Sequence, residues 1–188
     1  MNLPNILTLS RIILIPVFVI VFYLPLEERY WLSAGIFALA GATDWLDGYL
    51  ARRWNQATPF GAFLDPVADK LMVAAALTVL VEEHHTALLT LPAVVIIGRE
   101  IVISALREWM AEMGKRASVA VSWLGKIKTS CQMLAIIVLL AFAPDSAGAW
   151  CGLVLLYVAA ALTLWSMCIY LKAAWPEMFP AKGAAERA

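Results

Sequence analysis

The sequence predicts an all-α integral membrane protein with six transmembrane helices and both termini in the cytoplasm. Three observations lead to this prediction. Of the 188 residues, 63% are hydrophobic and only 15% are charged, whereas soluble domains are about 45–50% apolar and about 25% charged. Apolar runs long enough to cross a bilayer recur along the chain. The basic residues gather in alternate connections between these runs.

The predicted spans cover most of residues 1–172, which we expect to form one membrane domain. Their approximate limits, in chain order, are residues 6–26, 31–50, 60–81, 86–106, 123–142 and 149–171. Each run has about the 17–25 mostly apolar residues that a spanning helix needs. Residues 173–188 end in the small and polar stretch PAKGAAERA, and we expect this tail to be disordered.

The charged residues of the connections predict the orientation. The connections after the first, third and fifth runs carry Glu27, Glu28, Arg29, Glu82, Glu83 and Asp145. The other connections, with the tail, carry Arg52, Arg53, Arg107, Lys115, Arg116, Lys126, Lys128, Lys172, Lys182 and Arg187. Because Lys and Arg concentrate in cytoplasmic loops, this second set and both termini are placed in the cytoplasm. The longest cytoplasmic connection, residues 107–122, is predicted to lie along the inner leaflet as an amphipathic interfacial segment between the fourth and fifth helices.

Four aspartates interrupt the second and third apolar runs. Asp44 and Asp47 lie three residues apart near the cytoplasmic end of the second run, and Asp65 and Asp69 lie four apart at the start of the third. Such spacings place side chains on one face of a helix. Since the connection between the two runs is short, the helices are expected to pack antiparallel, and the two pairs would face each other near the cytoplasmic surface.

The acids could be neutralised by Arg52, Arg53 and Lys70 without any chemistry. Ionisable residues in spans, however, are rare and usually face a cavity or a partner. Four crowded carboxylates would repel one another by about 4 kcal/mol per pair at roughly 4 Å and an effective dielectric near 20. Two divalent cations would cancel this charge, and carboxylate oxygens favour Mg²⁺ or Mn²⁺. A pair of such ions suits displacement at phosphorus.

The residues between the acids indicate what such a metal site would bind. Gly48 and Gly61 let a ligand or a backbone come close, and Ala51 is a small residue one turn beyond Asp47. Arg52 adds a cation that can hold a phosphate through two hydrogen bonds. Together these residues predict a site for a metal-bound diphosphate.

These residues form the pattern Asp44-x2-Asp47-Gly48-x2-Ala51-Arg52-x8-Gly61-x3-Asp65-x3-Asp69. It resembles the complete signature of the CDP-alcohol phosphatidyltransferase family, with no position departing from it. The resemblance implies a six-helix membrane fold, a homodimer, and two divalent cations, Mg²⁺ or Mn²⁺, bound by the four aspartates, with Asp69 also the general base. It further implies CDP-diacylglycerol as the donor, and the residues expected to contact it are Asn5, Thr8, Gly48, Ala51, Arg52 and Gly61.

The segments NLPNILTLSRIILIP, REIVISALREWMAEMGKR and SVAVSWLGKIKTSCQM resemble bacterial members of this family that use sn-glycerol 3-phosphate as the acceptor. The implied reaction transfers the phosphatidyl group to that acceptor and releases CMP by direct displacement at the β-phosphorus. An anionic acceptor needs a second basic site, for which the candidates are Arg11, Arg107, Lys126 and Lys128. Basic residues at a cytoplasmic mouth also act as topological determinants or bind anionic lipids, and this alternative stays open.

Two alternative functions are open at this point. The same chemistry could serve inositol phosphate, serine or phosphatidylglycerol as the acceptor. A cation or anion transporter could use the acids as a transport site, but it would predict interrupted helices and symmetric halves, which the sequence does not show. It would also leave Gly48, Ala51 and Arg52 unexplained. We expect an enzyme of the bacterial cytoplasmic membrane, surrounded by lipids, with its site facing the cytoplasm and no nucleic acid partner.

Overall fold

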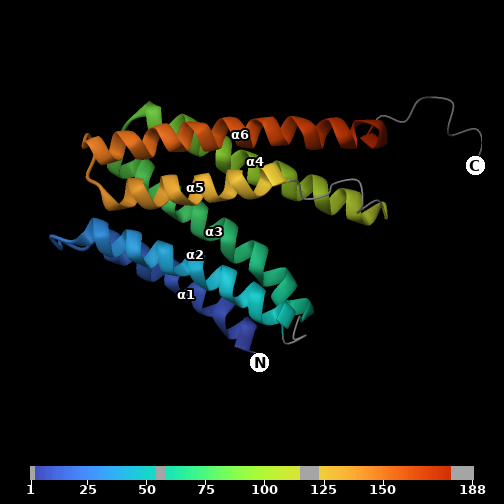
Figure 1. The fold of residues 1–188 in the computed structure, drawn as a ribbon, viewed down its shortest axis with the longest axis horizontal. Coiled ribbons are helices and arrows are strands. Elements are labelled where there is room, and N and C mark those ends of the chain that lie inside the picture. Colours follow the sequence, from blue (N-terminus) through green and yellow to red (C-terminus); the bar gives the residue numbers. More distant parts are fainter. Residues whose placement is uncertain (1–2, 54–57, 115–122, 179–188) are drawn as a thin grey trace, which may run out of the picture.

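The computed structural model describes residues 3–53, 58–114 and 123–178, and these residues form six helices (Figure 1). Their bounds are α1 Leu3–Tyr23, α2 Arg29–Arg53, α3 Pro59–His84, α4 Ala87–Glu112, α5 Trp123–Ala141 and α6 Ala147–Met178. Each predicted apolar run therefore corresponds to one helix. Within these ranges, the side chains of residues 3–4, 45, 47–52, 123–126 and 176–177 lie outside the description.

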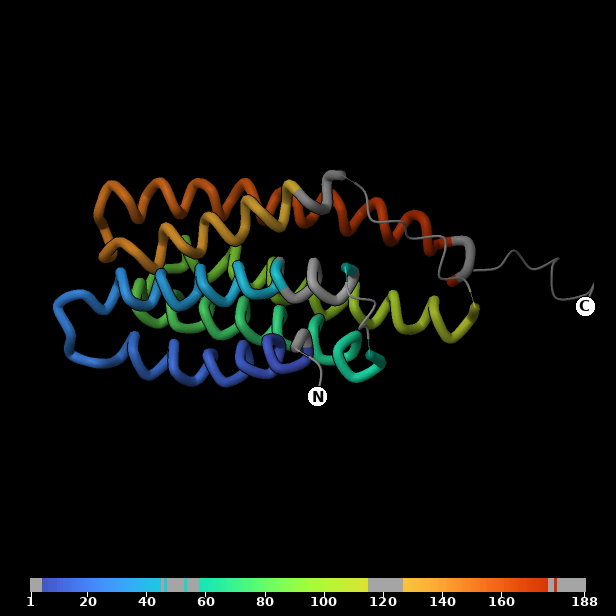
Figure 2. Tube along the Cα trace, turned by 60° about the horizontal axis from the view of Figure 1, so that its bottom comes forward, coloured from blue at the N-terminus to red at the C-terminus, as the bar shows by residue number. Residues whose placement is uncertain are grey.

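The helices form an elongated bundle in which α1 packs on α2 and α3, and α6 packs on α5 and α4. Contacts of α2 with α5 and of α3 with α4 join the two halves. The connections α1–α2, α3–α4 and α5–α6 lie at one end of the bundle, while α1 begins and α6 ends toward the other (Figures 1 and 2). The described chain therefore runs up and down along the bundle, an arrangement compatible with the predicted placement of both termini on one side.

The bundle interior is apolar, and most of its buried side chains form one cluster. Its largest fully buried members include Phe18, Phe22, Phe37, Leu77, Leu80, Ile96, Ile136 and Leu140. A ring of polar contacts covers the cluster at the end that holds the α1–α2 connection. There Arg29 donates to Glu83 at 2.6 Å, and the hydroxyls of Tyr30 and Tyr23 donate to Glu83 and Glu82. These contacts hold α1 and α2 against the C-terminal end of α3. They thereby help to set the position of the N-terminal end of α3.

Three helices of the described chain are long and apolar enough to cross a membrane: Asn5–Tyr23, Ala87–Glu112 and Ala147–Trp175. Large apolar side chains on these helices face outward, among them Ile20, Val94 and Trp165. Exposed apolar side chains on long helices are expected where lipid replaces water. The structure thus supports an all-helical membrane protein, and the crossing of all six helices stays a prediction.

Two helices extend beyond their predicted limits. α4 continues without a break to Glu112, so residues 107–112, which we assigned to an interfacial segment, belong to the same helix as the fourth span. Residues 115–122 of that segment lie outside the described residues. α6 continues to Met178, so residues 173–178, for which we expected disorder, are helical. The remainder of that tail, residues 179–188, also lies outside the description.

Candidate active site

One face of α1 contacts the start of α3. Asn5, Thr8 and Arg11 follow one another at intervals of three residues, and all three are buried although they are polar. Residues at this spacing lie on the same side of a helix. The Asn5 amide oxygen accepts a hydrogen bond of 2.9 Å from the Thr58 hydroxyl, and the Thr8 hydroxyl donates to Asp65 at 2.7 Å. Two residues predicted to bind the donor thus lie directly beside the aspartate pattern.

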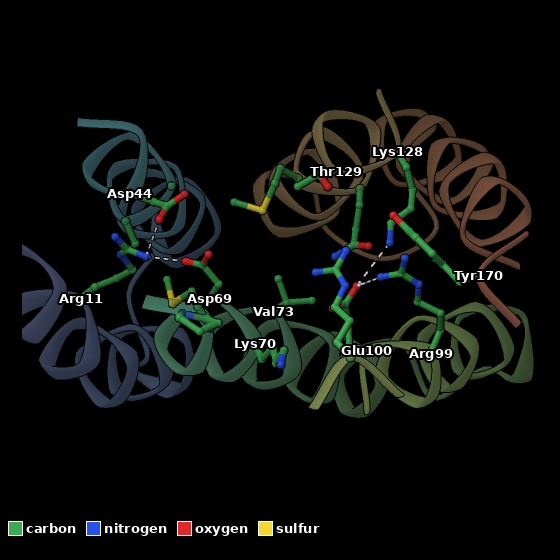
Figure 3. Close-up of a pocket in the computed structure, with 17 residues that line it drawn as sticks. Arg11, Asp44, Asp69, Lys70, Val73, Arg99, Glu100, Lys128, Thr129 and Tyr170 are labelled. Carbon is green, nitrogen blue, oxygen red and sulfur yellow. Dashed lines mark hydrogen bonds and ion pairs between the residues drawn. The ribbon is translucent and has the colours of Figure 1, made fainter. Parts of the chain in front are cut away.

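Arg11 joins two of the four aspartates. Its Nη1 donates to Asp44 at 2.9 Å and also to Asp69, on two different helices (Figure 3). The arginine is 1% exposed, whereas the side chains of Asp44 and Asp69 are 44% and 48% exposed. A buried guanidinium needs such partners because an unpaired charge is costly to bury. The antiparallel packing of α2 and α3 therefore does bring Asp44 and Asp69 together, as their spacing predicted.

Local sequence fixes the start of α3 and hence the positions of Asp65 and Asp69. Thr58 has extended backbone angles and acts as the N-cap, its hydroxyl accepting from the Gly61 N–H at 3.0 Å. Pro59 follows at the first helical position, where its missing N–H costs nothing. A Cβ atom on Gly61 would lie 2.7 Å from the Asn5 Oδ1. Glycine at this position therefore lets α1 approach the first turn of α3.

A second charged cluster lies on α4 and α5. Glu100 accepts from Arg99 at 2.8 Å and from Lys128 at 3.3 Å, and Arg99 also donates to Ser166 of α6 at 3.3 Å. Lys128 is buried (4% exposed), so this lysine is an interior group rather than a contact for lipid headgroups at the surface.

Arg107 lies next to this second cluster. Its guanidinium is 5.5 Å from the ring centroid of Tyr170, and that of Arg99 is 5.9 Å from the same ring. Cations within about 6 Å of an aromatic ring are attracted by its electron-rich face. The aromatic ring of α6 thus holds two arginines of α4 close together.

A cavity of about 420 Å³ connects the two charged clusters. All six helices contribute to its wall, which is formed by Arg11, Ala40, Gly41, Asp44, Pro66, Asp69, Lys70, Met72, Val73, Arg99, Glu100, Arg107, Lys128, Thr129, Gln132, Met133 and Tyr170. Figure 3 shows Asp44 and Asp69 on one side of this space and Arg99, Glu100 and Lys128 on the other. The cavity is therefore polarised, with carboxylates at one end and mostly cations at the other.

Several predicted residues cannot be placed at side-chain level. Asp47, Gly48, Ala51 and Arg52 lie on the last turns of α2, and Lys126 lies on the first turn of α5, where side chains are outside the description. Their helices carry them toward the end of the bundle that holds the cavity. Of the remaining predicted residues, the cavity wall includes Arg11, Asp44, Asp69, Arg107 and Lys128.

The cavity wall also contains residues that the sequence reasoning did not select. Glu100, Gln132 and Tyr170 lie in apolar helices and line the same space. A detectable signal existed for two of them, since Glu100 and Gln132 are polar residues inside predicted spans, where such residues usually face a cavity or a partner. Tyr170 carried no such signal because tyrosine is common in membrane helices.

Comparison with known proteins agrees with this arrangement. The family model of the CDP-alcohol phosphatidyltransferases matches residues 1–165. The chain belongs to this family. The CDP-diacylglycerol–glycerol-3-phosphate 3-phosphatidyltransferase of Salmonella typhimurium (strain LT2) is 60% identical over 173 residues, which are 92% of this chain and 94% of that protein. The enzyme of the same name from Escherichia coli (strain K12) is 59% identical over 177 residues, or 94% of this chain and 97% of that protein.

CDP-alcohol phosphatidyltransferases generally use divalent cations, and the carboxylate oxygens of this chain are suitable ligands for such ions. Asp44 and Asp69 converge closely enough to share one cationic nitrogen, that of Arg11, and carboxylate oxygens suit Mg²⁺ and Mn²⁺. Among the described residues, no group of three or more His, Cys, Asp or Glu side chains has the geometry of a metal site. Asp47, one of the four predicted ligands, is not among the side chains described.

Proposed function

We propose that this protein transfers the phosphatidyl group of CDP-diacylglycerol to sn-glycerol 3-phosphate, giving phosphatidylglycerophosphate and CMP. The observation that carries the proposal is the polarised cavity, in which carboxylates of α2 and α3 face a basic cluster of α4 and α5. A reaction between a metal-bound diphosphate and an anionic alcohol needs carboxylates that bind the metal ions and basic residues that bind the anionic acceptor. The two relatives named above, which carry this activity in their names, support the same assignment.

The donor would bind at the end of the cavity where α1 meets α3. Asn5, Thr8 and Gly61 lie beside the cavity rather than in its wall and would belong to this region, and Gly48, Ala51 and Arg52 would complete it around the nucleotide and the diphosphate. Mg²⁺ or Mn²⁺ ions held by Asp44, Asp47, Asp65 and Asp69 would neutralise the diphosphate and make CMP a better leaving group. The buried hydroxyl and amide groups of α1 would orient the donor at this end.

The reacting alcohol would lie beside Asp69. The carboxylate of Asp69 accepts the proton of the acceptor hydroxyl as the hydroxyl oxygen forms its bond to the β-phosphorus. The bond between that phosphorus and the bridging oxygen breaks, and its electron pair leaves with CMP. No covalent intermediate with the protein is needed for this balance, so we assign a direct displacement.

The acceptor phosphate would bind at the basic end. Arg107 and Lys128 line the cavity there together with Arg99, and Lys126 would add a further cation from the first turn of α5. An arginine pair held over Tyr170 suits a phosphate because guanidinium groups bind phosphate oxygens through two parallel hydrogen bonds. Arg11 lies at the opposite, acidic end, where it could contact the acceptor only near its reacting hydroxyl.

The proposed setting is the bacterial cytoplasmic membrane. Six spans with both termini in the cytoplasm would open the cavity toward cytoplasmic glycerol 3-phosphate, while lipid donors enter from the bilayer. A homodimer would follow from family membership, with outward apolar side chains of the helices at the interface or in contact with lipid.

The purified protein should be incubated in mixed micelles with CDP-diacylglycerol, Mg²⁺ or Mn²⁺, and glycerol 3-phosphate. We expect release of CMP in equal amount to the phosphatidylglycerophosphate formed, and loss of both when the divalent cation is chelated. Parallel reactions contain serine, inositol phosphate or phosphatidylglycerol in place of glycerol 3-phosphate. A product with one of these acceptors but none with glycerol 3-phosphate would overturn the acceptor assignment, and no CMP release with any of them would overturn the transferase assignment.

A further inference from the structure

Gln132 has an unsatisfied polar group at the cavity. The side chain is 4% exposed, and the residue belongs to the cavity wall. Within the described part of the chain, its amide oxygen Oε1 has no hydrogen-bond partner. Leaving a buried acceptor unpaired is costly, so buried polar groups of this kind normally have a partner.

The location of Gln132 connects it with the acceptor end of the cavity. On α5 it follows Lys128 by four residues and Thr129 by three, so the three side chains lie along one face of the helix, and all three line the cavity. Lys128 belongs to the basic cluster, and Figure 3 shows Thr129 between that cluster and the two aspartates. Gln132 is thus one helical turn from the group that would contact the acceptor phosphate.

We infer that Gln132 recognises a hydroxyl group of the acceptor, namely the secondary hydroxyl of glycerol 3-phosphate. This inference rests on the proposed function. With the phosphate at the basic end and the reacting hydroxyl at Asp69, the secondary hydroxyl lies between the two ends. An alcohol both donates and accepts hydrogen bonds, and an amide side chain offers the complementary acceptor and donor.

The chemistry of Oε1 excludes the charged parts of an acceptor as its partner. A phosphate dianion has only acceptor oxygens and cannot donate to an amide oxygen. The ammonium group of an amino alcohol could donate, but it would lie among Arg99, Arg107 and Lys128, and like charges repel in a cavity of low dielectric. A hydroxyl has the donor that Oε1 lacks and no charge. The residue would therefore select a phosphorylated polyol.

The test compares glycerol 3-phosphate with 3-hydroxypropyl phosphate, which keeps the phosphate and the reacting primary hydroxyl but lacks the secondary hydroxyl. We expect the wild-type protein to prefer glycerol 3-phosphate by roughly tenfold or more in kcat/KM, since a site built to pair with a hydroxyl discriminates against an analogue without it. Equal use of both acceptors by the wild-type protein would overturn the inference without any variant.

The variant Gln132→Met has a similar length and no hydrogen-bonding amide. We expect it to lower kcat/KM for glycerol 3-phosphate by about tenfold and to leave that for 3-hydroxypropyl phosphate within about twofold. The ratio of the two values is measured on one preparation, so it does not depend on the fraction of folded protein. Gln132→Glu keeps an acceptor oxygen in place and should keep most of the preference, although its charge lowers both rates.

The remaining outcomes distinguish a failure of this inference from a failure of the proposed function. An equal fall for both acceptors in Gln132→Met would show a structural role and overturn the inference while the proposed function stands. A wild-type protein that releases CMP with neither acceptor would overturn the proposed function, and the inference with it.

Discussion

The carboxylate of Asp69 pairs with Arg11, and this pairing would compete with its proposed role of accepting the proton of the acceptor. The substitution Asp69→Asn keeps an oxygen that can accept from Arg11 but removes the basic site. We expect turnover to fall by roughly 10²–10⁴-fold, the usual contribution of a general base, with little change in melting temperature. CMP release and thermal unfolding measure the two effects. Asp145→Asn, a change at an exposed turn residue with positive φ that asparagine tolerates, is the matched control, and near-normal turnover in Asp69→Asn would place the base elsewhere.

Arg11 supplies a positive charge that Asp44 and Asp69 share. Arg11→Met would remove this shared cation from the two carboxylates. We expect a lower melting temperature in EDTA, by several degrees, since one kcal/mol corresponds to about 2–4 °C in a chain of this size. Adding Mn²⁺ should raise the melting temperature of the variant more than that of the wild-type protein. An equal response of both proteins to Mn²⁺ would show that Arg11 and the ion do not share these carboxylates.

The contacts between residues of the candidate site could be predicted from the sequence only in part. The spacings of the aspartates and the short connection between α2 and α3 predicted that the two pairs face each other, and one member of each pair, Asp44 and Asp69, does share the same guanidinium nitrogen. The pairing of Arg99 with its neighbour Glu100 was also within reach of sequence reasoning. The contacts of Thr8 with Asp65 and of Arg11 with Asp69 were not, because they depend on the rotation of α1 against α3, which is set by packing between segments more than 50 residues apart.

The first turn of α3 packs closely against the first turns of α1 because Gly61 has no side chain at the contact. In Gly61→Ala the new methyl group would lie 2.7 Å from the Asn5 Oδ1 and 3.2 Å from the Thr58 Oγ1, so the buried Asn5 amide must move. Alanine favours helix by up to about 1 kcal/mol over glycine, and we therefore expect the fold to persist while the KM for CDP-diacylglycerol rises severalfold. The KM for glycerol 3-phosphate should change little.

Gly35→Ala is the control for this substitution, because a Cβ atom on Gly35 of α2 meets nothing within 4 Å. It should leave both KM values at their wild-type level. If Gly61→Ala changed the two KM values equally, the contact between α1 and α3 would support the whole cavity rather than the donor end.

The last residue of α3 is His84, a histidine whose ionisation should affect stability. Burial lowers the pKa of His84 below its ordinary value of 6.5, against the opposing charges of Glu83 and Asp145. Its Nε2 is buried without a hydrogen-bond partner among the described residues. Because the unfolded chain then binds the proton more readily, the free energy of unfolding should fall as the pH drops through 6.5 toward the folded-state pKa.

The melting temperature measured between pH 8 and pH 5 tests this dependence. His84→Gln should remove part of the decrease, whereas His85→Asn should not, since His85 is exposed and asparagine tolerates its left-handed backbone. An unchanged pH profile in His84→Gln would assign the decrease to other groups.

The helices themselves were predictable because each apolar run is long enough to be recognised by hydropathy alone. Their ends were less so. α4 continues to Glu112 and α6 to Met178 through stretches whose charged residues lower the hydropathy, while their arginine, lysine, glutamate, methionine and alanine residues favour helix. A membrane helix that leaves the bilayer needs no change in backbone conformation, so composition marks the limit of the apolar run and not the end of the helix.

The cavity exists only in the assembled bundle, since α1–α3 provide its acidic end and α4–α6 its basic end. This division explains why the aspartate pattern could be predicted to bind a diphosphate while the acceptor site could not be located with the same precision. The pattern lies within one segment of 26 residues, from Asp44 to Asp69, whereas the basic end combines α4, α5 and α6.

The orientation of the bundle in the membrane is the last prediction. Single cysteines at Glu27, in the α1–α2 connection, and at Met113, just after α4, would report opposite ends of the bundle, and both positions are exposed. They are introduced after the native Cys131, Cys151 and Cys168 have been replaced by alanine, and CMP release confirms that this background is active. In intact spheroplasts, a membrane-impermeant maleimide should label Glu27→Cys at once and Met113→Cys only after lysis, because Lys and Arg favour the cytoplasmic side. Labelling of Met113→Cys in intact cells would invert the orientation and turn the cavity away from its cytoplasmic acceptor.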